Sequence, residues 1–252
     1  MKFELVPLLQ IQRDLYDISN GEERFRIYLE TMLNADSSDV DLFPMVTMNP
    51  MGKGHISAVL DALLAMNAEA EATRAITEVS EQFEANPGIF KLGLVVADDL
   101  LGGWTNRYTC EFSARFELQQ SLKRGWLSAI LWTSEIPSVQ MVREETLITL
   151  HRVIYIQQHG IARTLQEMLN QEGYAMVMSG RQKPTLDIED IAYSWEVISP
   201  HLSTQDYPTI VACLFGDRAA HSLGYPPQGL SERAGLAVAL HQAKLHYSGA
   251  AD

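Results

Sequence analysis

The sequence predicts a helix-rich α+β or α/β fold with a small central β-sheet of about three or more short strands. Amphipathic stretches at helical spacing fill the first and last thirds of the chain. A β-branched apolar run, residues 90–97, lies between turn signals in the centre, which is typical of a buried strand. No repeat or long polar linker divides the chain. We therefore expect one domain over residues 1–252, with a helical N-terminal region (residues 1–87), a mixed central region (residues 88–183) and a helical C-terminal region (residues 184–252).

The N-terminal region is expected to be helical throughout. Apolar residues from Phe3 to Ile18 recur at helical spacing, and Asn20-Gly21 supplies a stop. Residues 22–33 form a second amphipathic stretch. A long helical pattern covers residues 56–83, and Asn67 is the predicted break between two helices.

The central region contains three predicted strands. The first covers residues 90–97, and the third covers residues 126–132. Residues 104–112 alternate Trp, Asn, Tyr, Cys and Phe with polar residues, which predicts the second strand. A short helix is expected between the second and third strands, over residues 114–123.

The remainder of the chain is again predicted to be helical. A helix follows Pro137 and extends from Ser138 to His159, where Gly160 interrupts the pattern. Further helices are expected over residues 161–170, 187–198, 206–215 and 231–246, the last with Ser231 as its N-cap.

Charge and composition exclude several classes of protein. The chain holds 19 Lys+Arg and 32 Asp+Glu, a net charge of −13. Because binding to a phosphate backbone needs clustered Lys and Arg, we expect no nucleic-acid partner. The apolar runs fall far short of the roughly 20 residues that a membrane helix needs, and the first residues lack the apolar centre of an export signal. We therefore expect a soluble cytoplasmic protein with no membrane partner.

The strongest candidate site follows the strand 90–97. Asp98 and Asp99 come directly after this strand, where open α/β sheets place their ligand groups. Adjacent carboxylates can divide their roles, one acting as an acid with a raised pKa while the other stays ionised. Gly102 and Gly103 would let the backbone approach a ligand, and Asn106 with Arg107 could hold an anionic group. The alternative is a strand, a turn and a second strand, with Arg107 in an ordinary ion pair.

A second candidate is the segment Asn49-Pro-Met-Gly-Lys-Gly-His55, which precedes a predicted helix. Lys53 and His55, together with amides at the helix start, could bind an anion. The segment lacks the first glycine and the hydroxyl residue of a P-loop, so an ATPase is not predicted. A plain glycine-rich turn is the alternative.

The third candidate is a polar stripe along the helix 138–159. Its members are Gln140, Glu144, His151, Tyr155, Gln158 and His159. Glu144 and His151 are candidate catalytic groups for proton transfer, and Tyr155 is a candidate ligand contact. Glu144 and His151 lie seven residues apart, which is too far for one metal ion. The alternative is a solvated or partly packed polar face.

Two functions remain open at this point. The first is a small-molecule enzyme such as a hydrolase, in which Asp98 or Asp99 serves as acid, base or metal ligand and His151 moves a proton. The second is a non-catalytic acidic binding or scaffold protein that acts through protein contacts, with Glu69, Glu71 and Glu78 on its surface. Neither a nucleophile elbow nor a dinucleotide fingerprint is present. The sequence leaves the cofactor and metal unknown, and a homo-oligomer is compatible with it.

Overall fold

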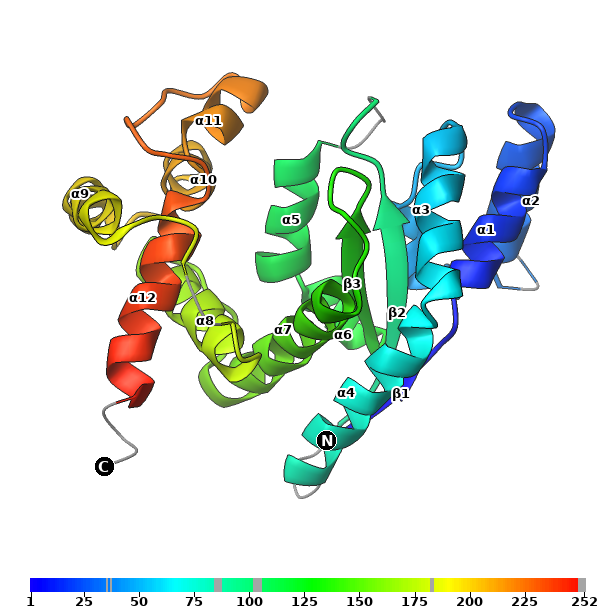
Figure 1. Cartoon of the computed structure of the whole chain (residues 1–252), viewed down its shortest axis with the longest axis horizontal. Helices are drawn as coiled ribbons and strands as arrows, with labels where there is room; N and C mark the ends of the chain where they lie inside the picture. Colours follow the sequence, from blue (N-terminus) through cyan, green and yellow to red (C-terminus); the bar gives the residue numbers. More distant parts are fainter. Residues whose placement is uncertain (35, 37, 84–87, 102–105, 182–183, 249–252) are drawn as a thin grey trace. The chain divides into compact units, whose positions relative to one another are not determined.

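The computed structural model describes residues 1–34, 36, 38–83, 88–101, 106–181 and 184–248. These residues group into two compact units, Met1–Thr149 and Leu150–Asp252, and each is described by itself. The predicted fold class is confirmed, since the described residues form many helices and one small parallel sheet (Figure 1). The division does not follow the boundaries of the predicted regions near residues 87 and 183, and the single domain stays a prediction.

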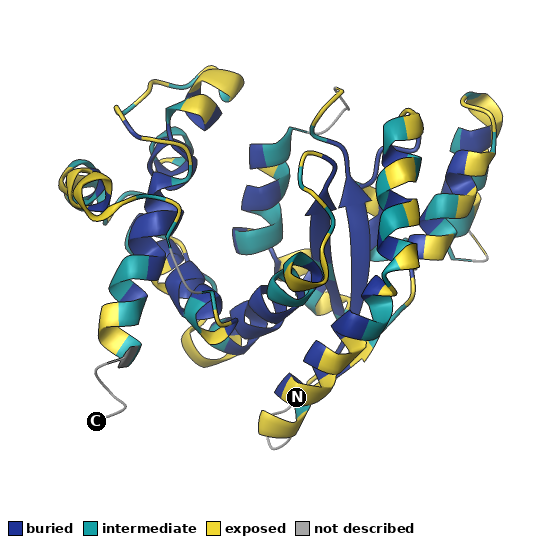
Figure 2. Cartoon of the chain, viewed as in Figure 1, coloured by how far each residue is buried: buried dark blue, intermediate teal, exposed yellow. Residues whose placement is uncertain are grey.

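The sheet belongs to the first unit and contains three parallel strands in the order β1-β2-β3. These strands are β1 (Lys2–Leu5), β2 (Ile89–Ala97) and β3 (Trp126–Trp132). Figure 2 shows β2 and β3 buried along almost their whole length, as expected for parallel strands rich in Val, Ile and Leu. Because they are parallel, β2 and β3 both end at the same edge of the sheet.

The first strand corrects the sequence prediction of a helix that starts at Phe3. Residues 2–5 pair with residues 89–92 of β2, and the helix α1 (Leu9–Asp17) begins only after Pro7. Phe3 is buried while Lys2 and Glu4 are exposed, which is the alternation of a strand. The helical prediction was wrong here because pairing with a distant strand decides these residues.

At Val96 of β2, the side chain of Gln12 takes the place of a neighbouring strand. The β1 strand covers only the first four residues of β2, so no described strand lies beside Val96 on that side. Gln12 of α1 is fully buried, and its amide donates to the Val96 carbonyl at 2.7 Å and accepts from the Val96 N–H at 2.9 Å. The amide therefore satisfies backbone groups that would otherwise be buried without partners.

Four further segments connect β1 to β2. They are α2 (Glu22–Met32), the 3₁₀ helix η1 (Phe43–Thr47), α3 (Gly54–Ala65) and α4 (Ala68–Gln82). Asn67 adopts a left-handed conformation with φ 58° between α3 and α4, which confirms the predicted break. The helix α4 packs against β1, whereas α1 and α3 pack against β2, and η1 contacts both β2 and β3.

The predicted strand over residues 104–112 was wrong for the residues of it that are described. Residues 107–116 form the helix α5 (Arg107–Phe116), and α6 (Gln119–Lys123) follows it. The side chain of Asn106 caps α5 by accepting from the backbone N–H groups of Tyr108 and Thr109. Tyr108, Phe112 and Phe116 are buried at a spacing of four residues, so the helical period explains the burial better than the alternation did.

The helices of the second half were predicted in part. The helix expected over residues 161–170 instead covers residues 165–178, and the helix over residues 217–223 was not predicted. The last helix begins at Ala234, so Ser231 is not its N-cap. The helix α7 (Val139–His159) confirms the long helix after Pro137 and crosses the boundary between the units. The second unit continues with α8 (Leu165–Met178), α9 (Ile188–Ile198), η2 (Ser199–His201), α10 (Tyr207–Phe215), α11 (Asp217–Leu223) and α12 (Ala234–Ser248). In the described ranges, no helix combines the length and hydropathy needed to cross a membrane.

The helices α8 and α12 pack closely in the second unit. Gly173 of α8 permits this approach, because a Cβ atom there would lie 2.6 Å from the Ala239 carbonyl oxygen of α12. Nearby, Arg152 and Glu172 form a buried ion pair with two nitrogen–oxygen contacts of 2.7 and 3.0 Å. Such a two-pronged pair fixes the geometry of the two side chains.

Candidate functional site

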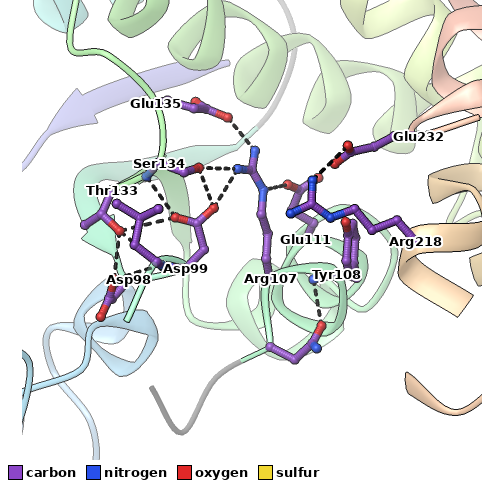
Figure 3. A network of polar contacts seen from close by, with 12 residues as sticks. Asp98, Asp99, Arg107, Tyr108, Glu111, Thr133, Ser134, Glu135, Arg218 and Glu232 are labelled. Atoms are coloured by element: carbon purple, nitrogen blue, oxygen red, sulfur yellow. Dashed lines mark hydrogen bonds and ion pairs between the residues drawn. The ribbon is translucent and has the colours of Figure 1, made fainter. Parts of the chain in front are cut away.

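Polar residues gather at the edge of the sheet where β2 and β3 end. Asp98 and Asp99 follow β2, and Thr133, Ser134 and Glu135 follow β3. Figure 3 shows the two aspartates and Thr133 side by side, with Arg107 reaching toward them from α5. The carboxyl edge of a parallel sheet is where α/β proteins usually place their ligand groups, as the sequence predicted for Asp98 and Asp99.

Asp98 is a buried carboxylate that accepts hydrogen bonds from three described groups. Only 2% of the residue is exposed, and its Oδ1 accepts from His55 Nε2 at 2.8 Å, from Thr133 Oγ1 at 2.8 Å and from the Leu100 N–H at 3.1 Å. Burial opposes the charged form, but these hydrogen bonds outweigh it and lower the pKa of Asp98 below its ordinary value. Asp98 is therefore a carboxylate near neutral pH.

His55 is the partner that the sequence did not connect with Asp98. It lies in the first turn of α3, and about a fifth of its side chain is exposed. Because an ionised carboxylate only accepts hydrogen bonds, Nε2 carries the proton that points to Asp98. The other ring nitrogen, Nδ1, is buried and has no hydrogen-bond partner among the described residues. The pair thus leaves one imidazole lone pair unused.

Arg107 is bound by groups of the protein itself. Its guanidinium contacts Asp99 Oδ2 at 2.7 Å, Glu111 Oε1 at 2.7 Å and also the Glu135 carboxylate, and it lies over the Trp132 ring at 4.9 Å. The burial of Arg107 opposes its charge, but Glu111 and Glu135 outweigh this effect and raise its pKa. The structure thus shows Arg107 in ion pairs, which was the alternative to its predicted role in binding an anionic group. An anionic ligand would have to displace these carboxylates.

Asp99 has the same direction of pKa shift as Asp98. Burial opposes its charge, yet hydrogen bonds from Ser134 and Arg107 outweigh burial and lower the pKa of Asp99. The Ser134 hydroxyl donates to Asp99 at 2.6 Å and the Ser134 N–H at 2.9 Å. The expected division between an acid with a raised pKa and an ionised neighbour is therefore wrong, since both carboxyls favour the ionised form.

The glycine-rich segment that precedes α3 holds His55 in place. Tyr16 donates its hydroxyl to the Asn49 carbonyl at 2.7 Å, and the buried Arg24 donates to the Gly52 carbonyl at 3.1 Å. Lys53 occupies the N-cap position of α3, but its exposed side chain makes no capping hydrogen bond. The positive end of the α3 dipole therefore lies beside His55 without a side-chain cap.

The other predicted site residues make different contacts or are outside the described ranges. Gly102 and Gly103 are outside the described residues. Asn106 is used as the cap of α5. Glu144 belongs to the first unit and accepts a solvent-exposed hydrogen bond from Gln140.

His151 and Tyr155 belong to the second unit. His151 is 5% exposed, and burial lowers its pKa to about 4. The rings of His151 and Tyr155 both contact Tyr174 of the same unit, with centroids 6.2 and 5.3 Å apart. His151 is thus a packed neutral imidazole, and the polar stripe is partly buried.

No described set of three or more His, Cys, Asp or Glu side chains is placed to hold a metal ion. The two cysteines, Cys110 and Cys213, form no disulfide bond. The pair His55–Asp98 is the arrangement in the first unit that combines a buried carboxylate with an unused lone pair.

Comparison with known proteins identifies no family. No family model matches the chain, and no solved structure matches it significantly. A stretch of 91 residues is 30% identical to the Bacillus subtilis (strain 168) protein named "Uncharacterized protein YjfC". This match covers 36% of the present chain and 30% of the relative, so the chain spans less than a third of that protein. The sequence is therefore similar to one segment of a longer protein whose printed name gives no activity.

Proposed function

We propose that the chain is a small-molecule hydrolase in which His55 acts as the general base and Asp98 orients it. The observation that carries this proposal is the 2.8 Å hydrogen bond between His55 Nε2 and the buried Asp98 carboxylate, together with the unpartnered Nδ1 within the described residues. A histidine whose second nitrogen is fixed by a carboxylate is a common arrangement for proton transfer.

The chemistry follows from the protonation states. Nδ1 is buried, so the reaction needs a water molecule to enter beside the ring. With Nε2–H donated to Asp98, the lone pair of Nδ1 then takes a proton from this water molecule. The water oxygen then forms a bond to the electrophilic carbon of an ester or amide. The carbon–oxygen or carbon–nitrogen bond to the leaving group breaks, and the imidazolium returns its proton to that group. The Asp98 carboxylate stabilises the imidazolium between these two steps.

The start of α3 supports binding of an anionic group beside His55. The helix has 12 residues, no acidic residue in its first turn and no side-chain cap at its N-terminus. Backbone N–H groups at such a helix start favour a carboxylate or a developing oxyanion. We therefore expect the substrate to be a small ester or amide, with an anionic group near Gly54 and His55.

The test is a hydrolysis assay with a panel of chromogenic esters and amides of small carboxylic acids. We expect His55→Gln and Asp98→Asn to lower the rate roughly 10²- to 10⁴-fold, which is the usual contribution of a general base. The matched control is His221→Gln, because His221 is exposed on α11 of the second unit. Circular dichroism verifies that each variant is folded.

Two results would contradict the proposal. One is turnover by His55→Gln at the rate of the unchanged protein. The other is a nitrogen-15 spectrum in which the proton of His55 is on Nδ1, because that tautomer has no lone pair on Nδ1 to accept a proton from water. Failure of the whole panel would exclude ester and amide hydrolysis.

The alternative function is an acidic binding protein that uses Glu69, Glu71 and Glu78, and each of these carboxylates has a partner within the first unit. Glu69 accepts a hydrogen bond from the Leu9 N–H at 3.0 Å, and Arg143 contacts both Glu71 and Glu78. Glu71 is buried, but the side chain of Glu78 is 51% exposed, so this alternative stays a proposal beside the hydrolase. Since the two cysteines form no disulfide bond, we also propose a reducing, cytoplasmic location for the enzyme.

A further inference from the structure

The second unit contains a cavity of about 400 Å³ that the proposed hydrolytic site does not use. Its lining consists of aromatic, amide and small side chains from α7, α8 and α12, namely Tyr155, His159, Asn170, Ala239, Gln242, Ala243, His246 and Tyr247. A volume of this size is in the range of small-molecule sites.

The cavity borders a chain of aromatic rings. Tyr155 contacts the His159 ring at a centroid distance of 4.2 Å, and His246 contacts Tyr247 at 4.8 Å. Tyr174 connects the two sides, with centroid distances of 5.3 Å to Tyr155 and 5.7 Å to Tyr247. Three of these contacts are edge-on and the contact between Tyr155 and Tyr174 is tilted, so the rings form a continuous aromatic wall beside the cavity.

The electrostatic environment of this wall favours a positive ligand. Among the described residues, no Lys, Arg, Asp or Glu lines the cavity. His159 and His246 lie in the last turns of α7 and α12, so the cavity lies near the negative ends of two helix dipoles. Burial, together with Tyr247 and the nearby Glu167 carboxylate, raises the pKa of Tyr155.

We propose that this cavity binds a small organic cation, such as a quaternary or methylated ammonium group, between Tyr155 and Tyr247. Aromatic faces attract such cations through their quadrupole, and a methylated ammonium group carries little hydration that would have to be removed. The amides of Asn170 and Gln242 offer hydrogen bonds to a polar group on the same ligand. This site is independent of the His55–Asp98 pair.

A neutral planar heterocycle is the competing ligand, because amide side chains and aromatic rings also bind such compounds. The two helix C-termini and Glu167 favour the cation over it. Adenosine therefore serves as a competitor in the test, and tighter binding of adenosine than of choline would overturn the proposal.

The experiment is calorimetric titration of the full chain with choline and with its uncharged analogue, in which carbon replaces the nitrogen. We expect choline to bind roughly tenfold more tightly than the analogue, because the two differ in charge and not in shape. Equal affinities, or no binding of choline, would overturn the proposal. This comparison needs no variant and is therefore insensitive to effects on folding.

Variants then locate the site. Tyr155→Leu and Tyr247→Leu should each weaken choline binding roughly tenfold, whereas Tyr247→Phe keeps the ring and should keep most of the affinity. The matched control is Tyr193→Leu, since Tyr193 of α9 is about half exposed and does not line the cavity. Full affinity in both Leu variants, or an equal loss in the control, would place the cation elsewhere.

Discussion

Arg107 illustrates how one side chain can hold several elements of the first unit together. Its guanidinium bridges Asp99 after β2, Glu111 within α5 and Glu135 after β3. The side chain of Arg107 is 19% exposed, but those of Asp99 and Glu111 are only 6% and 4% exposed. Removal of the arginine would leave the buried Asp99 carboxylate without a cation, and Glu111 would keep only the longer contact of 3.5 Å to Arg115, which is costly in free energy.

We expect Arg107→Met to lower the free energy of unfolding by about 3 kcal/mol. The matched control is Arg13→Met, because Arg13 is 21% exposed and also contacts two carboxylates, yet those of Asp17 and Asp61 are 68% and 58% exposed. A surface pair contributes less than about 1 kcal/mol, so the control should change little. Urea unfolding measures both values, and equal losses would contradict the role assigned to Arg107.

At the scale of the elements, local periodicity was sufficient to predict a helix where that helix has its own amphipathic pattern and caps. The break at Asn67 and the helix α9, which Asp187 caps, were predicted for this reason. The strand β1 was missed because four residues next to a helical pattern carry little local signal and gain their stability from β2. The start of α5 was missed because its aromatic residues also fit an alternating pattern.

The sequence predicted individual residues of the candidate site but not the pairing between them. Asp98 followed from the strand before it, and His55 followed from the glycine-rich turn. Their pairing joins residues 43 positions apart and depends on α3 starting at the carboxyl edge of the sheet, which no local pattern contains. His151 was assigned to the same site on helical geometry alone, and the structure instead packs it against Tyr174 in the second unit.

Gln12 provides a test of how the sheet is completed. We expect Gln12→Leu to lower the free energy of unfolding of the first unit by roughly 2–4 kcal/mol, because the N–H and C=O of Val96 would stay buried without partners. Gln10→Leu on the same helix is the control, since Gln10 is exposed and contacts only Asp14. Urea unfolding gives the difference, and hydrogen exchange at the Val96 N–H reports the local loss. Equal stability of the two variants would show that the amide is dispensable.

At the scale of the whole molecule, the two units should respond to acid in different ranges of pH. His151 has a pKa of about 4 in the folded state, against roughly 6.5 in the unfolded chain. Between these values only the unfolded state binds the proton, so the second unit loses stability as the pH falls, on the order of 3 kcal/mol in total. Asp98 and Asp99 have lowered pKa values, so their contribution to the first unit is lost only below about pH 4.

Hydrogen exchange between about pH 7 and pH 5, corrected for the intrinsic rate, separates the two units. Protection should decrease in the second unit and stay nearly constant in the first. His151→Phe removes the titrating group and should flatten the response, whereas His221→Phe should leave it unchanged because His221 is exposed. An unchanged response in His151→Phe would assign the acid sensitivity to another group.

The parallel sheet also has a consequence for synthesis on the ribosome. Residues 2–5 pair with residues 89–92, and Gln12 binds Val96, which lies 84 positions further along the chain. At about 5–20 residues per second, the growing chain waits several seconds before the partner of its first strand exists. During that interval α1 and α2 can form locally, but Phe3 and Leu5 have no strand to cover them. We expect the nascent first unit to bind holding chaperones until β2 has left the exit tunnel.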